Sequence, residues 1–159
     1  MVEAKRITVL GGGSFGTIIA NIAAENGHQV KQWMRDETRA AEIRDCRENK
    51  RYLPGYQLSE NLEPVCDLEE ALKGSELVFV SIPSSAFRQV IRNAKSFFKP
   101  EQMVVSTTKG IEADTFSLMS EILAQELPGA RIGVLSGPNL AKEIARRQLT
   151  ATVVASEDS

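Results

Sequence analysis

The sequence predicts an α/β fold, a doubly wound and mainly parallel sheet with helices on both faces. Two observations indicate this fold. Short apolar runs rich in β-branched residues alternate with stretches whose apolar residues recur at helical spacing, and glycine-rich or polar turns separate them. The 159 residues, 42% hydrophobic and 25% charged, suffice for one globular domain. We therefore expect a single domain over residues 1–159.

The first strand-to-helix junction carries a glycine motif. Residues 6–10 read as a strand and are followed by the pattern G-x-G-x-x-G at Gly11, Gly13 and Gly16. In a Rossmann-type βαβ unit the first glycine makes a tight turn, the second lets backbone approach a pyrophosphate, and the third lets the helix pack on its strand. The pyrophosphate would meet free N–H groups at the helix start. A helical pattern up to Gly27, a C-cap candidate, follows, so the motif favours cofactor binding over a purely structural turn.

The second predicted strand, residues 29–34, ends at the position where a Rossmann-type unit distinguishes NAD from NADP. Its lower apolar content places it near an edge of the sheet, and Arg35 and Asp36 follow it directly. An arginine here can pair with the extra phosphate of NADP, whereas an acidic side chain can accept hydrogen bonds from a ribose. Arg35 favours NADP, and Asp36 either caps the next helix or binds ribose. NADP and NAD are therefore the candidate cofactors, with NADP favoured.

The middle of the chain continues the alternation of strands and helices. Residues 52–56 contain a Pro-Gly turn, and Tyr52 either lies beside the cofactor or anchors this loop. Residues 64–66 read as a short strand, and Asp67 as the cap of the following helix. Residues 77–82 are almost continuously apolar, which is typical of a central strand that is covered on both faces.

Two further strand ends carry candidate ligand groups. Pro83 stops the central strand, and Ser84 begins a helical pattern, so that its hydroxyl caps the helix or its backbone lies near the cofactor. Lys109 and Gly110 follow a strand at residues 103–106, where an ammonium could meet a phosphate or a developing alkoxide. The spacing predicts that the next helix contains Phe116, Met119, Ile122 and Leu123.

The last third of the chain repeats this arrangement. Residues 131–135 read as a strand, and residues 136–139 open another helix. Gly137 permits a close backbone approach, and Asn139 can cap the helix or reach a ligand. We expect the buried face of this helix to contain Leu140, Ala141, Ile144 and Ala145. Residues 150–155 supply a final strand.

Composition argues against several classes of function. A formal net charge of -2 gives no electrostatic footprint for nucleic acid. No apolar run approaches the length of a bilayer span or a signal-peptide core, so we expect a cytoplasmic protein without membrane insertion. Cys46 and Cys66 lack the spacing of a metal or redox site, so we expect reduced thiols and no metal. For the single histidine, His28, we expect a surface or capping role rather than catalysis.

Five motifs together resemble the amino-terminal half of bacterial NAD(P)-dependent glycerol-3-phosphate dehydrogenases. They occupy residues 11–17, 52–55, 83–84, 108–112 and 136–143, and they span almost the whole chain. The resemblance implies that the cofactor is surrounded by Ser14, Phe15, Arg35, Tyr52 and Ala141. It also implies that Lys109 lies near both cofactor and substrate, and that Gly137 and Asn139 extend this site. The sequence departs from the family pattern at Asn139, commonly Ser or Thr, and at Leu140, commonly aromatic.

The resemblance also implies a reaction for the full-length family members. It is reversible hydride transfer between NAD(P)H and a small phosphorylated substrate, dihydroxyacetone phosphate, giving sn-glycerol 3-phosphate for phospholipid synthesis. A homodimer is one expected assembly.

The family has a helical substrate domain with a catalytic Lys-Asn pair after the region of resemblance. We therefore expect the catalytic lysine to lie beyond Ser159, no catalytic residue within residues 1–159, and little activity from these residues alone. A stand-alone NADP-binding or sensing module, or the cofactor domain of another hydroxyacid or ketoacid reductase, are the alternatives.

Overall fold

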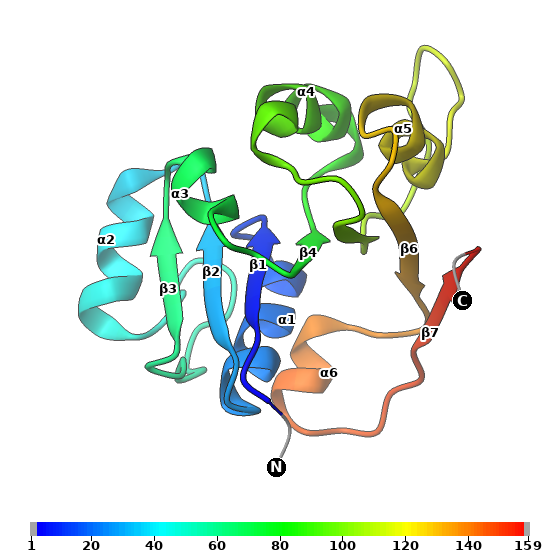
Figure 1. Cartoon of the computed structure of the whole chain (residues 1–159). Coiled ribbons are helices and arrows are strands. Elements are labelled where there is room, and N and C mark those ends of the chain that lie inside the picture. Colours follow the sequence, from blue (N-terminus) through cyan, green and yellow to red (C-terminus); the bar gives the residue numbers. More distant parts are fainter. Residues whose placement is uncertain (1–2, 158–159) are drawn as a thin grey trace.

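A seven-stranded sheet runs through the computed structural model, which describes residues 3–157 (Figure 1). The strands are β1 (Arg6–Leu10), β2 (Gln29–Trp33), β3 (Leu62–Val65), β4 (Leu77–Val80), β5 (Met103–Ser106), β6 (Arg131–Ser136) and β7 (Val153–Ser156). Their order is β3-β2-β1-β4-β5-β6-β7, and every neighbouring pair is parallel except β6 and β7. The predicted doubly wound, mainly parallel fold is confirmed, with β4 at the centre and β2 next to an edge.

The expected end of the domain lies outside the described part of the chain. Ser159, beyond which we expect the catalytic lysine, lies outside the described residues. Both the boundary at Ser159 and the place of the catalytic lysine therefore stay predictions from the sequence.

Helices cover both faces of this sheet. They are α1 (Ser14–Glu25), α2 (Glu37–Cys46), α3 (Leu68–Leu72), α4 (Ser84–Ala94), the 3-10 helix η1 (Lys95–Phe97), α5 (Met119–Glu126) and α6 (Ala141–Ala145). Strands after β1 are added first on one side of it and then, from β4 on, on the other side. Right-handed crossovers therefore place α1 and α2 on one face and α3, α4 and α5 on the other. Figure 1 shows α4 beside α5, and α6 beside α1.

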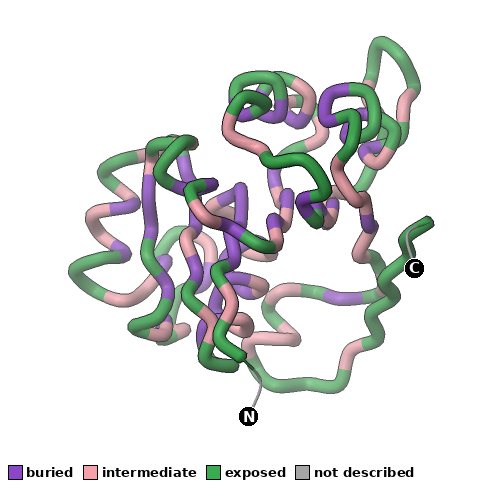
Figure 2. The backbone as a smooth tube through the Cα atoms, in the orientation of Figure 1, coloured by how far each residue is buried: buried purple, intermediate pink, exposed green. Residues whose placement is uncertain are grey.

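The core has one layer on each side of the sheet, as the alternation of side chains along β1 shows. Ile7 and Val9 pack with the α1 residues Ala20 and Ala24, whereas Leu10 belongs to the cluster that includes Phe87 of α4. In Figure 2 the buried backbone follows the central strands, and β7 is exposed along its length. The central strands are therefore fixed from both faces, so the loops at their carboxyl ends start from rigid positions.

The predicted helix around Phe116 is wrong at its start. Phe116 lies in a loop with φ +57° and is 74% exposed, and α5 begins only at Met119. Thr115 and Ser117 hydrogen-bond within this loop, which offers the backbone an alternative to a helical turn. The Glu121 carboxylate accepts the N–H of Leu118 at 2.7 Å, and this contact sets the true beginning of the helix.

Three other predicted elements differ in detail. The helix near residue 140 is α6, whose residues are all at least partly exposed, and Leu140 precedes it with 62% exposure. A five-residue helix whose main packing partner is α1 cannot bury a full face. The strand predicted at residues 64–66 begins earlier, at Leu62. Gly27, with φ +88°, follows the C-cap Asn26 instead of being the cap itself.

Within residues 3–157, no helix is long and apolar enough to cross a membrane.

Candidate functional site

The glycine loop after β1 packs against the end of β4, at the point where the strand order reverses. A Cβ added at Gly11, whose φ is +136°, would lie 2.0 Å from the carbonyl oxygen of Ser81. A Cβ at Gly16 would lie 2.5 Å from the carbonyl oxygen of Gly11, because α1 approaches its own strand so closely. A Cβ at Gly13 would meet no atom within 4 Å. Two glycines thus allow internal packing, and the space beside Gly13 is open to a ligand.

The N-terminus of α1 is built differently from those of α2 and α3. Asp36 and Asp67 cap α2 and α3 by accepting N–H groups of their first turns. At α1 the N-cap is Gly13, and no side chain among residues 3–157 caps this end or places an acidic group in its first turn. The N–H groups and the positive end of the helix dipole therefore face the space above the glycine loop, an arrangement that favours an anion.

Two cavities flank the glycine loop and together form one groove. The first, about 700 Å³, reaches from residues 11–13 past the end of β2 to Arg35, Arg39 and Tyr52. The second, about 580 Å³, reaches from Ser14 and Phe15 to Lys109. Residues 81–83 line both cavities, so the groove is continuous along the carboxyl ends of the strands. Its volume and position are typical of a site for an extended ligand in an open α/β sheet.

Three arginines and a tyrosine shape the first cavity. Asp36 accepts the backbone N–H of Arg39 at 3.1 Å and its guanidinium at 3.0 Å, so the predicted capping role is confirmed. The guanidinium carbons of Arg39 and Arg51 lie 4.9 Å and 5.5 Å from the ring centroid of Tyr52. Tyr52 therefore both holds its loop and lines the groove, while Arg35 is exposed at the rim. The sequence interpretation had missed Arg39 and Arg51.

The second cavity is lined by Lys109 and Asn139, two of the three residues predicted around the substrate, whereas Gly137 is not among its lining residues. Lys109 donates from Nζ to the carbonyl oxygen of Gly137 at 3.0 Å, although the two residues are 28 positions apart. Asn139 is buried, and its amide donates to the hydroxyl of Thr152 at 3.3 Å. Ala141 lies on the same wall. A cationic side chain and a buried amide thus face the same end of the groove as the start of α1.

Ser84 occupies this cavity in a different role from the one predicted for its hydroxyl. The N-cap of α4 is Pro83, and Ser84 is already the first helical residue, so the helix-capping interpretation is wrong. A residue with helical backbone angles cannot direct its own hydroxyl to the N–H groups that a cap satisfies. The Ser84 hydroxyl instead lies 3.6 Å from the position of a Cβ at Gly110, beside the Lys109 loop.

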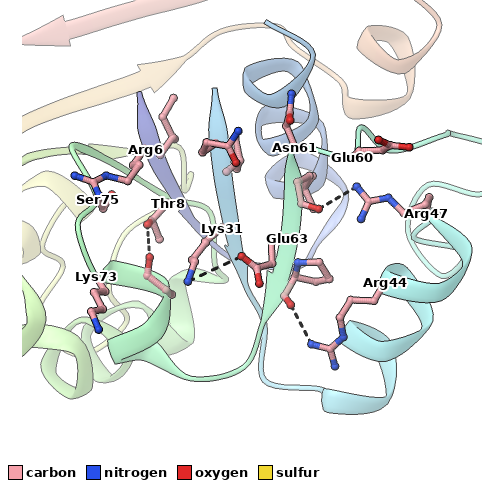
Figure 3. Close-up of a pocket in the computed structure, with 16 residues that line it drawn as sticks. Arg6, Thr8, Lys31, Arg44, Arg47, Glu60, Asn61, Glu63, Lys73 and Ser75 are labelled. Carbon is pink, nitrogen blue, oxygen red and sulfur yellow. Dashed lines mark hydrogen bonds and ion pairs between the residues drawn. The ribbon is translucent and has the colours of Figure 1, made fainter. Parts of the chain in front are cut away.

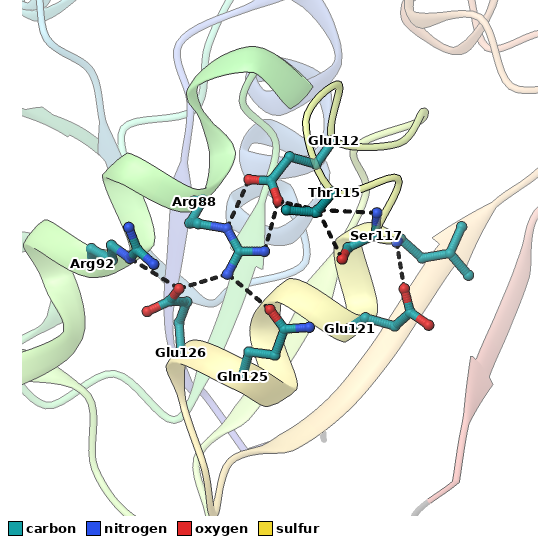
Figure 4. A network of polar contacts seen from close by, with 9 residues as sticks. Arg88, Arg92, Glu112, Thr115, Ser117, Glu121, Gln125 and Glu126 are labelled. Carbon is teal, nitrogen blue, oxygen red and sulfur yellow. Dashed lines mark hydrogen bonds and ion pairs between the residues drawn. The ribbon is translucent and has the colours of Figure 1, made fainter.

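An ion-pair network fastens the Lys109 loop to the helices behind it (Figure 4). Arg88 of α4 donates from Nε and Nη2 to the two carboxylate oxygens of Glu112, each at 2.7 Å, and from Nη1 to Glu126 at 2.7 Å. The hydrogen bond from Arg88, helped by one from Thr115, lowers the pKa of Glu112 to about 2. Glu112 follows Lys109 by three residues, so this bidentate pair limits how far the loop can move.

A third cavity, about 480 Å³, lies at the opposite ends of β1 and β2 (Figure 3). Among its basic side chains, Lys31 pairs with Glu63, and Arg44 and Arg47 donate to backbone carbonyls of the β3 strand. This cavity lies at the amino ends of the parallel strands, whereas ligands of open α/β sheets bind outside the carboxyl ends. It is not the candidate site.

The two cysteines lie away from the groove as free thiols. Burial, and next a hydrogen bond with Glu37, raises the pKa of the Cys66 thiol to about 11, so it stays protonated at neutral pH. Among residues 3–157, no three His, Cys, Asp or Glu side chains come together in a way that could hold a metal ion.

Comparisons with known proteins find relatives over almost the whole chain. The family model described as NAD-dependent glycerol-3-phosphate dehydrogenase N-terminus matches residues 6–159. Glycerol-3-phosphate dehydrogenases (NAD(P)+) from Pseudomonas aeruginosa strain LESB58 and Pseudomonas syringae pv. tomato are 58% and 60% identical over 158 residues, covering 99% of this chain and 46% of each relative. The crystal structure of glycerol-3-phosphate dehydrogenase from Coxiella burnetii superimposes with a TM-score of 0.92 at 34% identity, over 98% of this chain and 47% of that one. The chain spans about half the length of the curated relatives it matches.

Proposed function

The chain belongs to the NAD-dependent glycerol-3-phosphate dehydrogenase N-terminus family, and from this premise we propose that it is the cofactor-binding part of a dehydrogenase. The proposed reaction interconverts dihydroxyacetone phosphate and sn-glycerol 3-phosphate and serves phospholipid synthesis. One observation carries the proposal above all: the open glycine loop and Lys109 line the same continuous groove. Homodimer formation and a cytoplasmic location remain predictions from the sequence.

The groove fits a dinucleotide along its whole length. The uncapped start of α1 and the open space at Gly13 suit a pyrophosphate, which needs N–H donors and close backbone approach. The cavity with Tyr52 would hold the adenosine half, and the cavity with Phe15 and Lys109 the nicotinamide half. When bound, the cofactor supplies or accepts the hydride, while the protein provides orientation and charge.

We propose NADP as the favoured cofactor because of the charge around Asp36. Its two carboxylate oxygens are engaged by Arg39, so the acidic group that would otherwise accept ribose hydroxyls is already occupied. Arg35, Arg39 and Arg51 meanwhile line the same cavity and add positive charge. A phosphate on the ribose would meet guanidinium groups here, whose geometry suits phosphate oxygens.

Lys109 is the residue we assign to both cofactor and substrate. Its ammonium lies at the groove, where it would attract a substrate phosphate or the negative charge that develops on the carbonyl oxygen during reduction. Asn139 lines the same cavity, Gly137 accepts the Lys109 ammonium, and both would help to orient the ketone. We assign proton donation to a lysine beyond Ser159, in the half of the relatives that lies outside the matched region.

A binding titration tests this proposal. NADPH fluorescence should change on addition of the chain, with tighter binding for NADPH than for NADH. A Gly13→Val variant should fold normally, because the added atoms enter open space, but should lose most of the binding, because they fill the place proposed for the pyrophosphate. Equal affinity of wild type and the folded Gly13→Val variant would refute the placement of the cofactor.

A further inference from the structure

We propose that two buried amide side chains, Gln32 and Asn49, are positioning residues that direct the N–H groups of the glycine loop toward the cofactor. Together with Thr17 we call them the amide clamp. The inference rests on the proposed function, because it concerns how the loop is prepared for the pyrophosphate. It differs from the glycine motif itself, since neither amide belongs to that motif and neither lines the groove.

The amide clamp lies behind the glycine loop, away from solvent. Gln32 of β2, Asn49 of the segment after α2 and Thr17 of α1 are all 0% exposed. Gln32 donates from Nε2 to the carbonyl oxygen of Gly11 at 2.9 Å and to the Thr17 hydroxyl at 3.0 Å. Asn49 donates from Nδ2 to the carbonyl oxygen of Gly12 at 3.1 Å and to the same hydroxyl at 2.9 Å.

These bonds fix the direction of two peptide groups. In a trans peptide the C=O of one residue and the N–H of the next point in opposite directions, and the described residues contain no cis bond. Because the carbonyls of Gly11 and Gly12 point inward to the amide clamp, the N–H groups of Gly12 and Gly13 must point outward. Gly12 and Gly13 both line the groove. The loop therefore has its donors turned toward a ligand before any ligand binds.

Holding the loop in this direction costs free energy in the folded protein without ligand. Within the described residues, Gln32 Oε1 and Asn49 Oδ1 are buried without a hydrogen-bond partner. Turning either amide over would place its oxygen against a glycine carbonyl, so the side chains cannot relieve the cost by rotation. Apolar side chains of similar size would remove these two amide oxygens, but they would leave the carbonyl oxygens of Gly11 and Gly12 without the amide donors. The amides thus serve the glycine loop rather than the stability of the core.

Asn49 also connects the two halves of the groove. Its backbone carbonyl oxygen accepts the N–H groups of Tyr52 at 3.1 Å and Leu53 at 2.8 Å, so the backbone of Asn49 starts the turn that presents Tyr52. Its side chain holds Gly12. A change at Asn49 should therefore disturb both the pyrophosphate and the adenosine ends of the proposed site.

An Asn49→Ala variant tests the inference in the chain with and without NADPH. Without cofactor, we expect the 15N-edited amide signals of Gly12 and Gly13 to shift and their hydrogen exchange to become faster. With cofactor, we expect about tenfold weaker NADPH binding, the effect of losing about one well-made hydrogen bond. The matched control is Asn61→Ala, which removes an amide donor to the Ala24 carbonyl at the far end of α1 and should change neither readout.

A second pair of variants keeps the test decisive should Asn49→Ala fail to fold. Thr17→Ser retains the hydroxyl that both amides share, and Thr17→Val replaces it with a methyl group. Thr17→Ser should keep the wild-type glycine signals and NADPH affinity, whereas Thr17→Val should change both. Wild-type signals for Gly12 and Gly13 in Asn49→Ala, or in Thr17→Val, would overturn the amide clamp. Absence of NADPH binding by the wild type would instead refute the proposed function, because the glycine signals are measured without cofactor.

Discussion

Replacing Gly16 with alanine separates the packing role of the glycine loop from its binding role. Alanine is usually better in a helix than glycine by about 1 kcal/mol. Here the new Cβ would lie 2.5 Å from the Gly11 carbonyl oxygen and 3.3 Å from the Ser81 side chain. The first distance is about 1 Å short of an ordinary contact, and the obstructing atom is backbone that the buried Gln32 amide holds in place. We therefore expect a net loss of about 1–3 kcal/mol in the free energy of unfolding.

The assay is urea unfolding of wild type and Gly16→Ala, followed by near-ultraviolet circular dichroism from Trp33, whose strand ends beside the glycine loop. Gly13→Ala is the matched control because its Cβ would meet no atom within 4 Å, and we expect its unfolding free energy to stay within about 1 kcal/mol of wild type. A Gly16→Ala protein as stable as wild type, or more stable, would refute the close contact between α1 and β1.

Three further predictions concern charge and packing. Arg35→Ala should weaken NADPH binding about tenfold and leave NADH binding unchanged in a titration, and an unchanged NADPH:NADH affinity ratio would contradict the role of Arg35. The pKa of Glu112 is lowered from 4.5 to about 2 in the folded protein, so its contribution to stability is complete above about pH 4.5 and is lost as the pH falls toward 2. The difference in Tm between wild type and Glu112→Gln should accordingly shrink over this interval, and a constant difference would exclude the Arg88 pair as its origin. Phe87→Ala should lower the free energy of unfolding by about 3–5 kcal/mol in urea, because Phe87 of α4 is fully buried in the core; a loss below about 1 kcal/mol would show that the site is not well packed.

The parts of the molecule that follow from local sequence were predicted well. The strand ending at Leu10, the glycines after it and the aspartate caps of α2 and α3 are each defined by a few consecutive residues, and all are present. The central place of β4 and the position of β2 next to an edge were also predicted, from the apolar content of the two strands. Because these strands are parallel, their carboxyl ends share one edge, and Gly13 and Lys109 line a single groove.

The parts that depend on distant partners were not predicted. Gln32 reads as an ordinary polar residue in a strand near the edge, and only the packing of β2 beside the start of α1 reveals what its amide contacts. Arg88 is a helix-surface residue in the sequence and finds Glu112 only after α4 and the Lys109 loop are brought together. Phe116 has the helical spacing of a core residue but lies in a loop, because hydroxyl groups beside it provide competing hydrogen bonds.

The contact between Asp36 and Arg39 has a consequence for how such a site can change during evolution. A mutation of Arg39 to an uncharged residue would remove a cation from the cavity and at the same time release Asp36 Oδ2, while the backbone N–H of residue 39 still capped α2 through Oδ1. Both effects should weaken the binding of a phosphorylated ribose and favour a ribose with free hydroxyls. On the proposed placement of the cofactor, a single substitution at position 39 should therefore lower the preference for NADPH over NADH without rebuilding the protein.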